Sequence, residues 1–304
     1  MRVVVATHNR LGQVCIETLH AGGAEVAAVY TRPPTPGIAD QIDLRGTAEA
    51  VDAPLRVVDS LNTPSVIAEL EQLGPTYLFV VGWSQLVGQA VIDTASETAI
   101  GMHPSPLPRG RGRAPLAWAL IKGMDETALT MFELTEAADA GPIITQEPIE
   151  IGTDEYVSDV YSKMVETGEQ IIQSMMQDML SARISAKPQD EQLATYWPKR
   201  SPCDGLIDWS WGTQRVYDWI RAQTVPYPGA FSFIDDMRIT IWGAEIPSQQ
   251  VMDEVPGTVL FDHDRLEVAT FEGSIHLIEN TERGRFEQVE SKEQGRGGQR
   301  FFTS

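Results

Sequence analysis

Hydrophobic residues occur in short runs along the first third of the chain, and segments with helical spacing separate these runs. Short, uninterrupted apolar runs are typical of strands that are buried on both faces of a parallel sheet. The runs that predict strands cover residues 3–6, 25–30, 55–58 and 77–81. The segments that predict helices cover residues 10–20, 43–51 and 64–73. This alternation predicts an α/β fold with a Rossmann-like, doubly wound parallel sheet.

The second half of the chain has a different pattern. Two more apolar strands are expected over 128–132 and 143–149, followed by a long amphipathic helix over 156–180. Further on, 231–242 and 257–271 alternate between apolar and polar residues, as strands with one buried face do. The domains that follow from this change are a larger domain over 1–183, a linker over 184–203 and a smaller domain over 204–304. The polar, Gly-rich end of the chain, 281–304, is expected to be mobile.

Residues 101–118 stand apart from both patterns, because three prolines and then three arginines follow one another closely. Prolines at this density exclude a helix or a central strand. The loop follows a strand that ends near Ile100, so His103 is expected at the carboxyl end of a strand, where open α/β sheets bind ligands. Histidine can also gain and lose a proton near neutral pH. The alternative is a structural loop in which His103 caps a backbone carbonyl.

A second candidate side chain, Asp139, precedes a turn that Gly141 and Pro142 enforce between two apolar strands. A carboxylate beside a histidine can fix the tautomer of the ring and stabilise the imidazolium. On its own, the Asp-Ala-Gly sequence is only a turn signal.

Together these motifs resemble those of the formyltransferase family, whose members use N10-formyltetrahydrofolate to formylate methionyl-tRNA or amino sugars on nucleotides. The resemblance rests on His103 with its loop, Arg111–Trp118 and Ala138–Gly141, and continues in 204–210 and 226–231. It covers about residues 1–260. The motifs are most similar to those of members that act on UDP-4-amino-4-deoxy-L-arabinose.

The resemblance implies that the C-terminal domain is an OB-like β-barrel and that His103 and Asp139 are catalytic. Protonated His103 would stabilise a tetrahedral oxyanion, while Asp139 balances that charge or takes a proton from the attacking amine. The residues expected to bind the folate cosubstrate are Trp83, Ser84, Gln85, Leu86, Val87, Thr135 and Asp139. For the 82–87 loop, a strand-to-helix turn with a buried tryptophan is the alternative. The residues expected to bind the acceptor are Asn9, Ser105, Arg109, Arg111 and Arg113.

One position departs from the family pattern. The family carries an asparagine two residues before the histidine, where it orients the formyl group, and this chain has Gly101 there. A donor to an oxyanion is typically worth about 3 kcal/mol, so another group is expected to replace it. Our first candidate is an ordered water in the space beside Gly101, and the second is Asn9. A backbone N–H of the 101–109 loop is also a candidate.

Charge narrows the choice of acceptor. The net charge is −20, from 23 basic and 43 acidic residues, which disfavours nucleic acid as a substrate. The arginines at 109, 111 and 113 form a small patch that suits one or two phosphates. An amine on a nucleotide-linked sugar is therefore the expected acceptor, with methionyl-tRNA as the alternative. Gly101 leaves two further alternatives open. One is a catalytically weak protein that binds folate or sugar nucleotides, and the other is an enzyme that transfers another one-carbon group or a carbamoyl group. A homodimer is also possible for this chain.

Other classes of function lack their sequence signals. No Gly-x-Gly-x-x-Gly follows the first strand, which disfavours bound NAD or FAD, and the histidines and two cysteines lack metal-ligand spacing. No apolar run approaches the roughly 20 residues of a membrane span. Residues 1–6 are expected to form a strand and are too short for a signal peptide. The two cysteines, Cys15 and Cys203, lie in different predicted domains, so a disulfide framework is not expected and a cytoplasmic location is. Such an acidic surface suits a salt-rich cytoplasm, as in a halophile.

Overall fold

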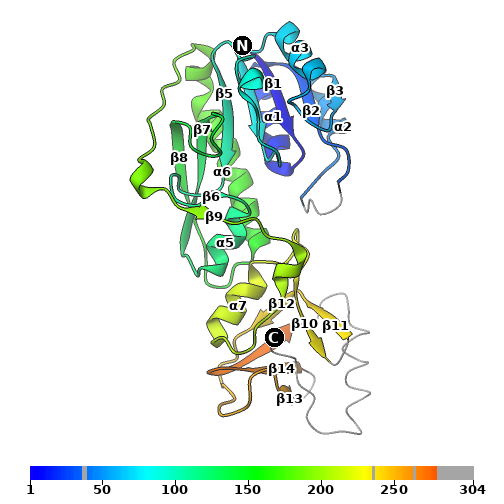
Figure 1. Ribbon diagram of the computed structural model, residues 1–304, viewed down its shortest axis with the longest axis vertical. Helices are drawn as coiled ribbons and strands as arrows, with labels where there is room; N and C mark the ends of the chain where they lie inside the picture. The colour runs from blue at the N-terminus through cyan, green and yellow to red at the C-terminus, as the bar shows by residue number, and fades with distance from the viewer. Residues whose placement is uncertain (36–39, 235–236, 263–264, 279–304) are drawn as a thin grey trace. The chain divides into compact units, whose positions relative to one another are not determined.

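The computed structural model describes residues 1–35, 40–234, 237–262 and 265–278 (Figure 1). The chain forms two compact units. Unit 1 comprises 1–115, 126–150 and 160–199, and unit 2 comprises 116–125, 151–159 and the chain from residue 200 onward. The end predicted to be mobile, 281–304, lies outside the described residues. No helix in the part of the chain that the structure describes is long and apolar enough to span a bilayer.

Unit 1 is built on one seven-stranded sheet with the order β3-β2-β1-β4-β5-β7-β8. Its strands are β1 (Arg2–Thr7), β2 (Glu25–Thr31), β3 (Leu55–Val57), β4 (Tyr77–Val81), β5 (Thr98–His103), β7 (Glu126–Glu133) and β8 (Ile143–Glu150). The first five are parallel, as predicted. The last two strands correct the prediction of a fully parallel sheet, because β7 is antiparallel to β5 and forms a hairpin with β8. A short turn can join only antiparallel neighbours, and the Gly141–Pro142 turn is such a connection.

Helices cover both faces of this sheet (Figure 1). They are α1 (Arg10–Ala21), α2 (Arg45–Ala50), α3 (Pro64–Leu73), α4 (Gln89–Ile92) and α6 (Val157–Leu180). The short α5 (Pro115–Ile121) follows the histidine loop in sequence and belongs to unit 2 from Leu116 onward. Val4 and Ala6 of β1 belong to one apolar cluster with Leu70 of α3 and Val91 of α4. Gly168 of α6 packs so closely on α1 that a Cβ there would clash with Leu11. The doubly wound, Rossmann-like fold is thereby confirmed.

Strand register places the site. Thr7 of β1 pairs with Val81 of β4, and Val81 pairs with Met102 of β5. The residues that follow these three, His8, Gly82 and His103, therefore lie at one level of the sheet's carboxyl edge. Neighbouring strands are about 4.8 Å apart, so two histidines flank a glycine at this edge.

The segment predicted as a linker is not a free connection in its first part. Lys187 bridges Ile143, the residues Glu191–Leu193 form a 3-10 turn, and β9 (Tyr196–Trp197) pairs in parallel with β6 (Arg111–Gly112). The segment up to residue 199 is thus part of unit 1. Its pairing with residues 111–112 braces the histidine loop.

Unit 2 contains α7 (Thr213–Arg221) and two antiparallel sheets. One pairs β10 (Ala230–Ile234) with β11 (Met237–Ile241), and the other has the order β12-β15-β14-β13. The latter strands are β12 (Gly243–Glu245), β13 (Val259–Asp262), β14 (Arg265–Thr270) and β15 (Gly273–Ile278). Each segment predicted to alternate as strands, 231–242 and 257–271, contains two antiparallel strands. Within the described residues the sheets do not close into a barrel, and the fully buried Trp209 centres their core.

Candidate active site

His103, the last residue of β5, is buried and faces two hydrogen-bond acceptors. Its Nε2 lies 2.9 Å from the carbonyl oxygen of Gly110, and its Nδ1 lies 3.6 Å from Oδ1 of Asp139. Each ring nitrogen therefore faces an oxygen atom, one from a backbone carbonyl and one from a carboxylate. His103 thus contacts a backbone carbonyl, as in the structural-loop alternative, and also faces the carboxylate of Asp139. The ring is held in one orientation from both sides.

Asp139 is oriented by contacts from two segments that are distant in sequence. Its Oδ2 accepts a hydrogen bond of 2.9 Å from the backbone N–H of Gly112, and its carbonyl accepts one of 2.8 Å from Gln189. Its backbone is left-handed, with φ at 54°, a conformation that aspartate tolerates better than most residues. The preorganised carboxylate keeps 20% of its side-chain surface exposed, so a ligand can reach it.

The space beside Gly101 is filled, which contradicts our first candidate for the missing donor. A Cβ at this position would lie 2.8 Å from Cδ2 of Leu134 and 2.9 Å from Cζ of Phe132. The expected water has no room here, and an asparagine fits only if these apolar side chains move. The apolar residues of β7 and its extension have taken the place that the family gives to a polar side chain.

Two residues expected to bind the acceptor have buried side chains that are engaged within the protein. Ser105 is fully buried, and its hydroxyl donates to the carbonyl of Arg109 at 2.9 Å within the loop. The Arg111 side chain is 1% exposed and forms a 2.7 Å ion pair with Glu191, with Gln189 as a further partner. Both residues shape the loop. Arg109 and Arg113, in contrast, are exposed.

Asn9 is the N-cap of α1, where its Oδ1 accepts from the N–H of Gly12 at 3.1 Å. Its Nδ2 donates to Asp40 at 3.1 Å, which uses one of the two amide hydrogens. A Cβ on Gly82 would overlap the Asn9 amide, so this amide lies directly over Gly82. Gly82 neighbours His103 across the sheet edge, which brings the Asn9 amide close to the catalytic candidates.

The 82–87 loop follows β4 at the same edge. Trp83 and Val87 pack partly buried against the apolar cluster, whereas the side chain of Leu86 is 65% exposed. The Oε1 atom of Gln85 is buried without a hydrogen-bond partner. Thr135, in the turn after β7, donates to the carbonyl of Ala137 at 3.1 Å. The loop thus offers an apolar side chain and an unsatisfied acceptor.

Two side chains at this edge were not identified from the sequence. His8 follows β1 and its ring centroid lies 6.1 Å from that of Trp83. Burial lowers the pKa of the His8 imidazole, although Asp40 partly opposes this shift. Arg32 follows β2 and donates to the hydroxyl of Ser84 at 2.7 Å. The rule that selected His103, a polar residue directly after a buried parallel strand, would have selected both.

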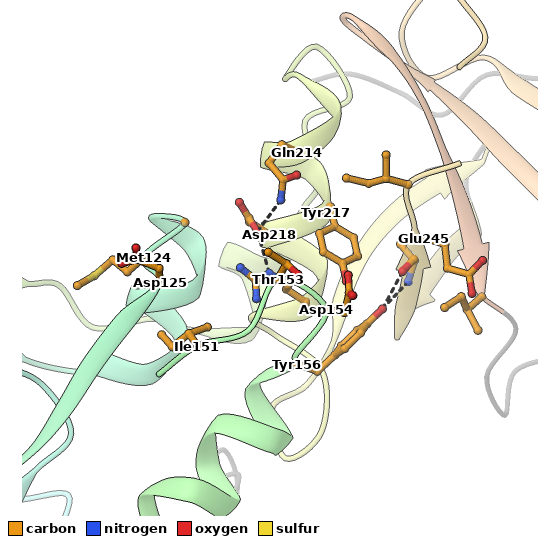
Figure 2. Close-up of a pocket in the computed structure, with 15 residues that line it drawn as sticks. Met124, Asp125, Ile151, Thr153, Asp154, Tyr156, Gln214, Tyr217, Asp218 and Glu245 are labelled. Carbon is orange, nitrogen blue, oxygen red and sulfur yellow. Dashed lines mark hydrogen bonds and ion pairs between the residues drawn. The ribbon is translucent and has the colours of Figure 1, made fainter. Parts of the chain in front are cut away.

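Unit 2 has a separate pocket of about 650 Å³, lined by α7, β12 and residues 123–125 and 151–156 (Figure 2). Four carboxylates line it: Asp125, Asp154, Asp218 and Glu245. Its one arginine, Arg221, pairs with Asp218 at 2.8 Å and donates to the carbonyls of Gly152 and Glu155. This acidic pocket is unsuited to phosphate groups. Arg221 thereby holds the 152–155 segment on α7.

The Rossmann-like fold carries an imidazole–carboxylate pair at the carboxyl edge of its sheet. The models of the formyl transferase domain and of the formyl transferase C-terminal domain match residues 1–176 and 199–290. The chain belongs to the formyl transferase family. The prediction of a formyltransferase with a formyltetrahydrofolate donor is thereby confirmed at the level of the family.

Solved structures share the fold at low sequence identity. WlaRD, a sugar 3N-formyl transferase solved with dTDP and 5-N-formyl-THF, has a TM-score of 0.67 at 16% identity over 92% of this chain and 98% of that one. The N-formyltransferase from Helicobacter canadensis, solved with folinic acid and dTDP-3-aminofucose, has a TM-score of 0.65 at 14% identity over 91% and 99%. HypX from Aquifex aeolicus, solved with tetrahydrofolic acid, scores 0.63 at 18% identity over 91% of this chain and 43% of that one.

Proposed function

We propose that this protein transfers the formyl group of N10-formyltetrahydrofolate to the primary amine of a nucleotide-linked amino sugar. The observation that carries the proposal is the fixed His103–Asp139 pair at the carboxyl edge of a formyl transferase domain. The choice of a sugar nucleotide is supported by the net charge of −20, which repels a tRNA, and by the sugar formyltransferases that share the fold.

The folate would bind along the 82–87 loop, with Thr135 and Asp139 on the opposite side. A pterin is a flat ring with donors and acceptors on its edge. The exposed Leu86 offers an apolar surface for such a ring, and the unpartnered Oε1 of Gln85 offers an acceptor for one of its N–H groups. The residues present therefore fit this cosubstrate.

His103 and Asp139 divide the chemistry between them. When the acceptor amine attacks the formyl carbon, negative charge develops on the formyl oxygen, and the imidazolium of His103 supplies compensating charge. Asp139 is placed to take the proton that the amine loses. The bond from the formyl carbon to N10 then breaks, and N10 receives a proton. Because both residues are fixed beforehand, little reorganisation accompanies the reaction.

We propose Asn9 as the donor to the oxyanion, in place of the water and the loop N–H groups considered above. In the 101–109 loop, the N–H groups of Ser105, Leu107 and Arg109 bond to carbonyls of the loop itself, and the prolines have none. The space beside Gly101 is filled. Asn9 retains one amide hydrogen after its bond to Asp40, and its amide covers Gly82 beside His103. This side chain would take the role of the family asparagine from another strand.

The proposal is tested by incubating the purified protein with formyltetrahydrofolate and a panel of UDP- and dTDP-amino sugars. Mass spectrometry should detect a product heavier by one formyl group in place of one hydrogen, and His103→Ala should abolish its formation. Formylation of methionyl-tRNA without sugar activity would support the alternative acceptor. No formyl transfer to either acceptor class would contradict the proposal.

A further inference from the structure

We propose that Arg32 and Arg113 form an anion clamp around Ser84 that binds the phosphate groups of the acceptor nucleotide. This inference rests on the proposed function. It replaces the patch expected from the arginines at 109, 111 and 113, because Arg111 is turned inward.

The clamp is defined by two hydrogen bonds to one residue. Arg32 reaches Ser84 from the end of β2 and donates to its hydroxyl at 2.7 Å. Arg113 reaches it from the histidine loop and donates to its carbonyl at 2.8 Å. The two guanidinium groups thus approach Ser84 from different segments, and each uses only part of its five N–H donors there.

Neither charge is neutralised within the described part of the chain. Five other arginines form ion pairs with carboxylates: Arg2, Arg45, Arg56, Arg111 and Arg221. Arg32 and Arg113 have no such pair among the described residues, although acidic residues outnumber basic ones 43 to 23. Keeping two cations together without a carboxylate, in so acidic a protein, favours an anionic ligand.

Arg32 also has an unused donor in a place that water reaches poorly. Its Nε is buried and lacks a hydrogen-bond partner. A buried donor without a partner costs free energy, and an oxyanion would satisfy it. The planar guanidinium suits phosphate because two parallel N–H groups can bond to two oxygens at once.

The clamp is continuous with the catalytic candidates. Gly112, the neighbour of Arg113, donates to the carboxylate of Asp139, which in turn faces His103. A phosphate held at Ser84 would therefore lie in the same part of unit 1 as the reacting pair. A diphosphate carries enough negative charge to match both guanidinium groups. The carboxylates of the folate tail are the alternative anionic groups that could bind to the clamp.

The experiment compares binding of UDP, dTDP, inorganic pyrophosphate and folinic acid by calorimetry. Arg32→Gln and Arg113→Gln should each weaken binding of the preferred nucleotide by about 10- to 100-fold, since a hydrogen bond to a charged group is lost. Folinic acid binding should fall much less than nucleotide binding in both variants. Arg45→Gln is the matched control, because it removes the same charge from an exposed arginine that pairs with Asp43.

Several outcomes would overturn the clamp. The first is that the wild-type protein binds neither a nucleoside diphosphate nor pyrophosphate. The second is that both variants bind the nucleotide with unchanged affinity. The third is that the variants lose only folinic acid binding, because the arginines would then bind the folate tail. The proposed function has a separate readout. Nucleotide binding without formyl transfer would contradict that function and leave the clamp standing, whereas transfer that both variants support with unchanged KM for the acceptor would contradict only the clamp.

Discussion

The sheet edge of unit 1 and the pocket of unit 2 hold opposite arrangements of charge. At the sheet edge, Arg32 and Arg113 share one serine and have no carboxylate partner among the described residues. In the pocket, Arg221 is paired with Asp218 and donates to two carbonyls, and further carboxylates line the same pocket. An arginine that pairs with a carboxylate and holds backbone carbonyls is a structural brace. An arginine with unused donors is available to a ligand. Whether an arginine is paired with a carboxylate therefore distinguishes a ligand site from a structural contact better than the size of a cavity does.

The largest effect expected at the sheet edge is on turnover in His103→Ala. Loss of a positioned acid–base group typically costs about 10²- to 10⁴-fold, so kcat for formyl transfer should fall by at least 10²-fold. Circular dichroism and folinic acid binding serve as controls for the fold and the folate site. A folded variant with near-normal turnover would remove His103 from the reaction.

The next largest effect is expected for Asn9→Ser, which separates two roles of one side chain. Serine retains an oxygen that can cap α1 but lacks the amide donor. We expect kcat to fall by about 10²- to 10³-fold, as for removal of an oxyanion donor, with little loss of thermal stability. Asn9→Asp, which also retains the cap oxygen, serves as a second variant. If kcat of both folded variants equals that of the wild type, Asn9 acts only as the N-cap of α1.

Substitution in the unit 2 pocket should instead change stability. Asp218→Asn leaves the Arg221 charge buried without its carboxylate, and breaking a buried pair costs about 3 kcal/mol. The midpoint of urea unfolding should fall, while kcat of the folded enzyme stays the same. Asp154→Asn is the matched control, because Asp154 is exposed and lines the same pocket. Equal effects of the two substitutions would show that the pairing of Arg221 is unimportant.

The smallest effect concerns pH and His8. Because burial lowers the pKa of His8 in the folded state, the unfolded chain takes up a proton first as the pH falls below the ordinary value of 6.5. More protons are then bound in the unfolded state, so stability decreases with falling pH in this window. In His8→Gln, the unfolding temperature should fall less between pH 7 and pH 5.5 than in the wild type. An identical decrease would exclude His8 as the group responsible.

Much of the sheet could be predicted from the sequence because its strands are short, wholly apolar runs. The run at 77–81 matches β4 in both of its bounds. The pairing of β10 with β11 within 231–242 was not predicted, because the apolar residues at 231, 233, 237, 239 and 241 keep one alternating phase through both strands. Similarly, the motif that contains Arg111 and Arg113 indicates a loop with positive charge. Only the fold shows that Arg111 meets Glu191, 80 residues away in sequence, and turns away from the ligand side.

The brace between the histidine loop and the segment 191–197 has a consequence for fragment design. The loop depends on Thr195, whose hydroxyl and carbonyl accept from the N–H groups of Gly110 and Arg111, and on Glu191, which pairs with the buried guanidinium of Arg111. A catalytic fragment that stops at residue 183 discards all three contacts and leaves a buried cation without its partner. A fragment that extends to residue 199 retains them. Residues 184–199 therefore belong to any minimal piece of this enzyme prepared for crystallisation or for activity assays.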